Sequence, residues 1–190
     1  MSQPPPPPPL QPPPLGEAEA EATGGFLAEV RGWGLDPRYW AHAKLLLSEV
    51  HGLPCFPQYP DTFWLFGRPL CRVEVAGVVI GKHPKEQFTD LYVDDGSATI
   101  RCSVYHNAAL GEVVEEVQLG AFVVVQGKIS CYLHQRKISV FHIRIEEDPN
   151  AETLHYLQAM HLKKEVYSKT AATTAATTTN SAASVRVPAK

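Results

Sequence analysis

The chain has 190 residues, which is enough for one domain or for one domain with long tails. A formal net charge of −3 argues against a strongly basic nucleic-acid protein and against a polybasic membrane binder. It does not exclude nucleic acid, because affinity also depends on local charge and stacking. The sequence shows no apolar run long enough to cross a bilayer and no signal peptide at its N-terminus. We therefore expect a soluble, intracellular protein that does not engage membranes.

Residues that usually carry catalysis or bind metals lack the necessary spacing. The four cysteines include no CxxC pair, and the eight histidines show no metal-ligand spacing. The sequence also contains no phosphate-binding loop, nucleophile elbow or GxGxxG motif. The paired Asp94 and Asp95 are followed by a glycine, which fits a turn better than acid–base chemistry. We expect no enzyme activity, no cofactor and no bound metal.

Both ends of the chain have low complexity. Residues 1–30 begin with proline runs followed by alanine and glutamate, a composition that can form polyproline II but cannot bury a core. A flexible tail is the favoured interpretation, and docking into an SH3- or WW-type groove is the alternative. Residues 168–190 are rich in alanine and threonine, and we expect them to be disordered. The folded domain should therefore span residues 31–167.

The folded part should begin with a helix. In residues 36–52, Asp36 is a good N-cap, Pro37 suits the first helical position, and apolar residues recur at helical spacing until Gly52. The apolar stripe is one-sided, so we expect the helix to lie on the rest of the domain. Trp33 and Trp40 are interpreted as anchors of that docking, with base stacking as the alternative. Prolines predict an irregular connector over residues 52–62, followed by a short extended piece with a turn over residues 63–70.

The central part of the chain predicts a small barrel. A strand at 73–81, which bends at Gly77, is followed by a loop, a strand at 88–94, an Asp-Gly hairpin turn and a strand at 98–105. A short helix at 111–118, in which Val113 and Val117 cover the open end of the barrel, precedes strands at 121–132, with a bend at Gly127, and 137–145. This order predicts a mainly β protein with one five-stranded OB-fold Greek-key barrel.

A second helix should follow the barrel over residues 151–167. Its apolar side chains lie along one side, which makes it amphipathic. Because the barrel is already closed, we interpret this helix as the docking site of a partner subunit, and folding back on its own barrel is the alternative. The side chains expected to contact the partner are Leu154, Tyr156, Leu157 and Met160.

Alternation along the strands divides inward from outward side chains. Ile100, Cys102 and Val104 should face inward, which leaves Ser103 outside. The strand at 88–94 is ambiguous, and if Leu91 and Val93 face inward, Asp90 and Tyr92 face outward. The outward set mixes aromatic rings with cations, a mixture that suits single-stranded nucleic acid but also occurs on ordinary barrel surfaces. The candidate nucleic-acid contacts are Tyr92, Arg101, Tyr105, Lys128, Tyr132, Arg136 and Lys137.

Three stretches together resemble one family. The pattern VxVxGxVIG at 73–81, YVDDGSATIRC at 92–102 and WGLDPRYWAHAKLLL at 33–47 are similar to the Stn1 subunit of the CST telomere-capping complex, a relative of the middle subunit of replication protein A. The resemblance covers residues 33–167. It implies a nuclear, telomeric OB-fold protein that binds single-stranded telomeric DNA, protects chromosome ends and supports C-strand fill-in by DNA polymerase α-primase. It also implies a heterodimer with the smallest CST subunit, alongside the large CST subunit.

The resemblance carries some residue roles onto this chain. It places DNA contacts at Tyr105 and Tyr132 and adds Asp94, the first aspartate of the turn. Ser130 stands where family members can carry an arginine. The winged-helix domains that follow the barrel in some members are not found in this sequence, which in this respect is similar to the short form of plants. A middle-subunit-like component of a replication protein A complex and a protein-only OB scaffold are the alternatives.

Overall fold

The computed structural model describes residue 34 and residues 37–56, 59–106, 110–132 and 135–169. Every helix and strand belongs to the compact unit that begins at Pro37. The two tail predictions, over 1–30 and most of 168–190, lie outside the described residues, as do Trp33 and the proposed N-cap Asp36.

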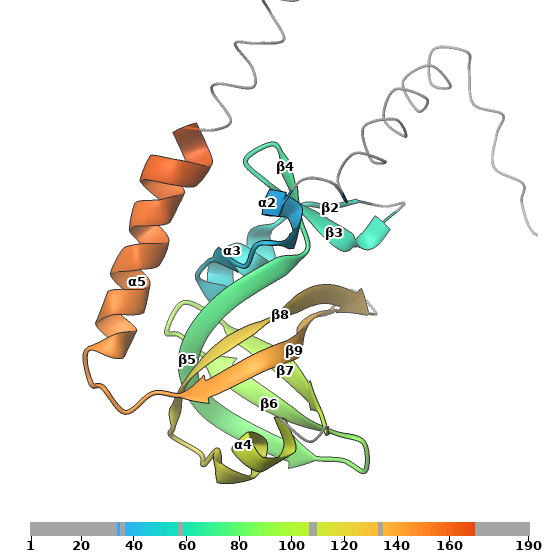
Figure 1. Cartoon of the computed structure of the whole chain (residues 1–190), viewed down its shortest axis with the longest axis vertical. Coiled ribbons are helices and arrows are strands. Elements are labelled where there is room, and N and C mark those ends of the chain that lie inside the picture. The colour runs from blue at the N-terminus through green and yellow to red at the C-terminus, as the bar shows by residue number, and fades with distance from the viewer. Residues whose placement is uncertain (1–33, 35–36, 57–58, 107–109, 133–134, 170–190) are drawn as a thin grey trace, which may run out of the picture. The chain divides into compact units, whose positions relative to one another are not determined.

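Five strands close into the predicted barrel (Figure 1). Antiparallel pairs join β5 to β6, β6 to β7, β8 to β9 and β5 to β8, and β7 pairs in parallel with β9. This is the pairing scheme of a five-stranded Greek-key OB barrel, so the predicted fold class is confirmed. The strands are β5 (Arg72–Pro84), β6 (Phe88–Asp94), β7 (Thr99–Tyr105), β8 (Phe122–Tyr132) and β9 (Gln135–Ile145).

Two glycines let the strands of the barrel approach one another. The strand β5 pairs with β8 as far as Val78 and with β6 from Val78 onward, so it changes partner beside Gly77. A Cβ atom on Gly77 would lie 2.4 Å from the Asp94 carbonyl oxygen, and one on Gly127 would lie 2.4 Å from that of Ser139. Both predicted bend positions are therefore places where only a glycine leaves room for the neighbouring backbone.

The barrel core consists of the side chains predicted to face inward. Leu91, Val93, Ile100, Cys102 and Val104 are all fully buried, together with inward residues of β5, β8 and β9. The helix α4 (Leu110–Glu116) covers the open end, as expected.

Of the two residues predicted to cover the open end of the barrel, one is confirmed. Val117 is buried, but Val113 is only partly buried, and Leu110 and Val114 do the covering instead. The Lys82 ammonium group holds the end of α4 by donating to the carbonyl oxygens of Val114 at 2.8 Å and Val117 at 2.9 Å. Such a cation suits the negative end of a helix.

The single N-terminal helix predicted from residue 36 to residue 52 is wrong. The structure has a helix α2 (Pro37–Trp40), a short strand β1 (Ala43–Lys44) and a helix α3 (Leu47–Gly52). The chain between the helices is extended because β1 pairs in parallel with β5, and the Leu45 amide donates to the Glu74 carbonyl oxygen at 3.2 Å. Of the apolar residues that suggested one helix, Ala43 and Leu46 are buried along an extended segment, and Leu47 and Val50 are buried on α3.

The hairpin turn after β6 caps α3. Asp95 Oδ2 accepts the backbone N–H of Leu47 at 2.7 Å, and Asp95 Oδ1 accepts the N–H groups of Ser97 and Ala98. One carboxylate therefore closes the turn and also satisfies a free N–H at the first turn of a helix, where negative charge is favoured.

The irregular connector predicted over residues 52–62 is also wrong. A three-stranded antiparallel sheet forms from β2 (Cys55–Phe56), β3 (Tyr59–Leu65) and β4 (Arg68–Leu70). Phe63 is fully buried and anchors β3. The extended piece with a turn at 63–70 is confirmed, with Phe66 and Gly67 at positive φ between β3 and β4.

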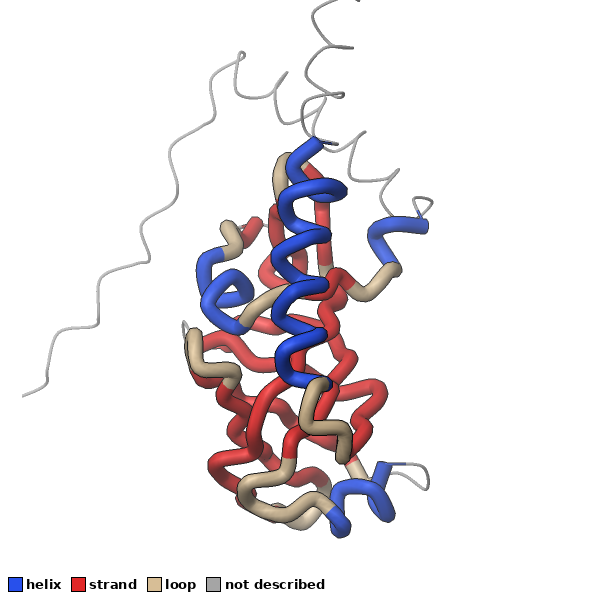
Figure 2. Tube along the Cα trace, turned by 90° about the vertical axis from the view of Figure 1, so that its left-hand side faces the viewer, coloured by secondary structure: helices blue, strands red, loops and turns tan. Residues whose placement is uncertain are grey.

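The second helix folds back on its own barrel with one face and exposes the other. It comprises α5 (Ala151–Leu162) and a π-helical turn η1 (Lys163–Tyr167), and Figure 2 shows it as the long helix beside the strands. His155 and Ala159 are buried against the barrel, and the Tyr167 hydroxyl accepts the Lys44 N–H at 3.1 Å. The expected partner-binding side chains remain exposed by 42–55%, namely Leu154, Tyr156, Leu157 and Met160.

Two side chains expected outside are buried. Asp90 and Ser103 are 3% and 2% exposed. Their burial is tolerated because Ser103 Oγ donates to Asp90 Oδ1 at 2.6 Å and Lys85 Nζ donates to Asp90 Oδ2 at 2.8 Å. Burial acts to raise the pKa of Asp90, but these hydrogen bonds and the charges of Lys85 and Arg101 outweigh it and hold the pKa below its usual value.

Replacing Gly77 with alanine should destabilise the protein by about 1–3 kcal/mol, because the added methyl group overlaps the backbone where β5 changes partner. Urea denaturation measures this loss. Gly111→Ala is the control, since a Cβ atom there has no neighbour within 4 Å and alanine favours the helix α4. Equal stability of Gly77→Ala and the wild type would contradict the role given to Gly77.

Replacing Asp90 with asparagine should lower the melting temperature at pH 7 and matter less in acid. A carboxyl whose pKa is depressed on folding contributes stability above its unfolded pKa, about 3.9, and loses it as the pH falls through the folded pKa. The difference in melting temperature between wild type and Asp90→Asn should therefore shrink from pH 7 to about pH 3. A constant difference over that range would contradict the charged state assigned to Asp90.

Candidate nucleic-acid interface

The outward face of β6, β7 and β9 aligns three of the predicted contacts. Tyr92 pairs with Arg101 across β6 and β7, and Arg101 pairs with Lys137 across β7 and β9. On the other side of β9, Lys137 pairs with Ser130 of β8. Because neighbouring strands are about 4.8 Å apart, this register forms one row of an aromatic ring and two cations across the barrel.

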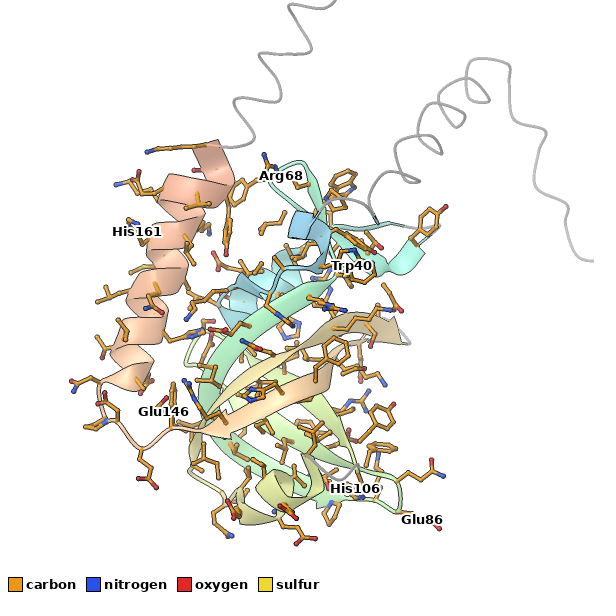
Figure 3. The ribbon with its side chains drawn as sticks, in the orientation of Figure 1. Trp40, Arg68, Glu86, His106, Glu146 and His161 are labelled. Atoms are coloured by element: carbon orange, nitrogen blue, oxygen red, sulfur yellow. The ribbon has the colours of Figure 1, made fainter. Side chains whose placement is uncertain are left out.

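An aromatic pair lies at one end of this face. The rings of Phe88 and Tyr105 are 5.5 Å apart, and the Lys85 ammonium group lies 4.7 Å from the centre of the Phe88 ring. Tyr105 is 47% exposed. Glu86 and His106, labelled in Figure 3, mark this end, where β6 begins and β7 has just ended.

Phe88 and Lys85 were not among the predicted contacts. Phe88 follows from alternation alone, since it lies on the same face of β6 as Tyr92. Lys85 lies in the loop between β5 and β6, and its position comes from its ion pair with the buried Asp90, which no local pattern indicates. We use "the β6–β7 face" for Lys85, Phe88, Tyr92, Arg101, Tyr105 and Lys137.

Three further predicted residues have partners within the chain. Asp94 accepts the Gly96 N–H at 2.7 Å and the Thr99 hydroxyl at 2.9 Å, so it shapes the turn. The Arg136 guanidinium donates to the carbonyl oxygens of Val50 and Leu53 at the end of α3 and lies 5.2 Å from the Phe63 ring. Lys128 Nζ pairs with Asp61 at 2.6 Å, where both side chains are partly exposed.

Tyr132 ends β8 opposite Gln135. Its side chain and the residues 133–134 that follow lie outside the described part of the structure, so its predicted contact stays a prediction.

The β6–β7 face carries three cations, and the carboxylates of Glu86 and Asp94 lie at its edges. Its cations are Lys85, Arg101 and Lys137, and the carboxylate beneath them, Asp90, is buried and paired. Exposed rings can stack on bases while cations track the phosphates, which is the chemistry of single-strand binding. The surface therefore offers the two kinds of group that single-strand binding uses.

The described residues also show whether a reactive thiol, a metal site or a membrane-spanning helix is found among them. Burial raises the pKa of the Cys102 thiol to about 12, so it is not a ready nucleophile. Among the residues described, no group of three or more His, Cys, Asp and Glu side chains is arranged to hold a metal ion. None of the described helices has the length and apolarity needed to cross a membrane.

Comparison with known families gives a match over much of the chain. Residues 57–179 match the family of the telomere regulation protein Stn1. The CST complex subunit STN1 of Ailuropoda melanoleuca is 30% identical over 162 residues, covering 71% of this chain and 44% of that protein. The Arabidopsis thaliana subunit of the same name is 26% identical over 146 residues, covering 66% of this chain and 91% of its own length.

Solved structures share the fold. The S. pombe Stn1–Ten1 complex contains a chain that superposes with a TM-score of 0.64 at 20% identity, over 70% of this chain and 98% of that one. A replication protein A heterotrimer bound to single-stranded DNA contains another, with a TM-score of 0.57 at 22% identity, over 64% of this chain and 93% of that one.

These matches agree with the resemblance seen at residues 33–47, 73–81 and 92–102. The chain spans less than half of the length of the Ailuropoda melanoleuca relative and most of the length of the Arabidopsis thaliana one. With the family match extending over residues 57–179, the chain belongs to the Stn1 family of telomere regulation proteins.

Proposed function

We propose that this chain binds single-stranded telomeric DNA through the β6–β7 face, as a non-enzymatic subunit of a CST-type complex that protects chromosome ends in the nucleus. The observation that carries the proposal is the row of Tyr92, Arg101 and Lys137 beside the Phe88–Tyr105 pair. The row supplies two cations for phosphates and the pair supplies exposed aromatic surface for bases. Support of C-strand fill-in by DNA polymerase α-primase belongs to the same proposal.

The other predicted contacts have different roles in this proposal. Tyr132 is proposed as a stacking residue at the end of β8. Lys128 can exchange its pairing with Asp61 for a phosphate, since that ion pair is partly exposed and such pairs contribute little stability. Asp94 and Arg136 act indirectly in this proposal, because each holds the backbone at the edge of the barrel.

The exposed face of α5 is the proposed docking site for a small OB-fold subunit. Its exposed apolar side chains are Leu154, Tyr156, Leu157 and Met160, which lie among polar ones, and the opposite face is already buried through His155 and Ala159. A hollow of about 400 Å³ beside Tyr156 and Leu157 is bordered by the turn at Asp95 and Gly96. The S. pombe relative was solved in complex with Ten1, which supports a partner of this kind. The large CST subunit is a further proposed partner.

A second candidate function is a middle-subunit-like role in a replication protein A complex, one chain of which shares this fold with a TM-score of 0.57. Affinity purification of the full chain from cells with mass spectrometry separates the two. Recovery of CST subunits supports the first function and recovery of replication protein A subunits supports the second. A protein-only scaffold would recover partners yet show no salt-dependent binding of single-stranded DNA.

Replacing both Tyr105 and Tyr132 with alanine should weaken single-strand binding by the assembled complex. Each lost stacking contact is worth about 1–3 kcal/mol, or roughly a tenfold to hundredfold change in affinity. Fluorescence anisotropy with a telomeric oligonucleotide measures this, and the melting temperature should change little because Tyr105 is exposed. Leu119→Ala, which removes a side chain that is 66% exposed between α4 and β8, is the control. Unchanged affinity of the double variant would refute the site.

Replacing Leu157 with glutamate should prevent pairing with the small OB-fold subunit without unfolding the chain, because Leu157 is 55% exposed in the chain alone. A charge placed in an apolar contact remains buried and unpaired. Co-purification of the two subunits measures the effect. Leu119→Glu, at a side chain that is 66% exposed between α4 and β8, is the matched control. Normal pairing of the Leu157 variant would exclude this face.

A further inference from the structure

A second aromatic and cationic cluster lies away from the β6–β7 face. The Arg72 guanidinium lies between two rings, 5.0 Å from the centre of the Trp40 ring and 5.2 Å from that of Phe141. Trp40 is 46% exposed and Phe141 is 48% exposed. We call Trp40, Arg72 and Phe141 the Trp40 cluster. Figure 3 labels Trp40, which lies on α2 close to the start of β5.

The Trp40 cluster is assembled from three separate segments, each held in place. The helix α2 is fastened through Tyr39, whose hydroxyl lies 3.2 Å from Thr62 Oγ1 and whose carbonyl oxygen accepts the Cys71 thiol at 3.3 Å. These contacts fix Tyr39 and leave the next side chain, Trp40, on the outside.

Phe141 reaches the surface because of a bulge in β9. The register of β8 and β9 shifts between Gln126, which pairs with His142, and Gly127, which pairs with Val140, so Phe141 has no opposite residue. Phe141 and His142 are consecutive and both exposed, while Val140 and Ile143 on either side are buried. A bulge that redirects a side chain in this way is a common device near binding sites.

The Trp40 cluster is continuous with the β6–β7 face. Across β7, β9, β8 and β5 the register runs from Ser103 to Ser139, from Ser139 to Lys128 and from Lys128 to Arg72. These three steps span about 14 Å at the usual strand spacing. That is about four nucleotides at the 3.4 Å spacing of stacked bases in one strand of duplex DNA.

We propose that the single-stranded DNA path continues from the β6–β7 face over β9 and β8 to the Trp40 cluster. Bases stack on Trp40 and Phe141 there, and Arg72 and Lys128 contact phosphates. This extension rests on the proposed function of the β6–β7 face. It makes the chain a binder of a longer strand than that face alone would hold, within the range of about 4–16 nucleotides typical of one OB fold.

The chemistry of the cluster favours nucleic acid over a protein partner. Its exposed rings flank the Arg72 guanidinium, whereas the exposed face of α5 presents Leu154, Leu157 and Met160 among polar side chains. Because Trp, Phe and Arg also occur in protein interfaces, a protein contact is the outcome to be distinguished.

The test compares a short and a long oligonucleotide on the full chain, alone and with its small OB-fold partner. Anisotropy titrations use telomeric single strands of about 4 and about 12 nucleotides, lengths near the ends of the range for one OB fold. Phe141→Ala and Arg72→Gln should each weaken binding of the long strand about tenfold and affect the short strand much less. Tyr105→Ala should weaken binding of both strands, and Leu119→Ala should weaken binding of neither.

Each result separates this extension from the proposed function beneath it. Unchanged long-strand binding by Phe141→Ala and Arg72→Gln, with Tyr105→Ala still defective, would overturn the extension and leave the β6–β7 face intact. Loss of partner pairing in these variants with normal DNA binding would also overturn it and identify a protein contact. Failure of the wild type to bind either strand would overturn both proposals.

Discussion

The barrel depends on one exchange of partners within β5. Up to Val78 this strand pairs with β8 and from Val78 onward with β6, and the glycine at position 77 leaves room for the Asp94 backbone at the crossing point. Asp94 ends β6, and the adjacent Asp95 closes the turn and caps α3. The position of β5 therefore fixes the turn after β6, and the Asp95 carboxylate in that turn fixes the start of α3.

Closure of the barrel also creates the candidate surface. The parallel pairing of β7 with β9 brings Lys137 level with Arg101, although a helix and a strand separate them along the chain. Closure on the other side brings Arg72 level with Lys128. The cations thus lie on adjacent strands because the sheet is closed. The exposed rings lie near the two ends of this row of cations. A chain with a net charge of −3 gathers cations on one surface in this way, and Lys85 and Lys128 among them are paired with carboxylates.

Much of the fold could be predicted from the sequence because its signals are local. Alternation identified the buried Leu91, Val93 and Ile100, and the Asp-Gly pair identified the hairpin. The single N-terminal helix was mispredicted because Ala43 and Lys44 pair in parallel with β5, a contact between distant residues that interrupts the helix. The roles of Lys82, Arg136 and the Asp90–Ser103 pair could not be predicted for the same reason, since each depends on a partner from another element.

Amide chemical-shift mapping of the full chain during titration with single-stranded telomeric DNA tests most directly whether the β6–β7 face is the binding surface. The largest changes should fall on β6, β7 and β9, and the amides of α5 should change little. Changes confined to α5 or α4, or no changes at DNA concentrations that bind the assembled complex, would contradict the assignment of DNA binding to this face.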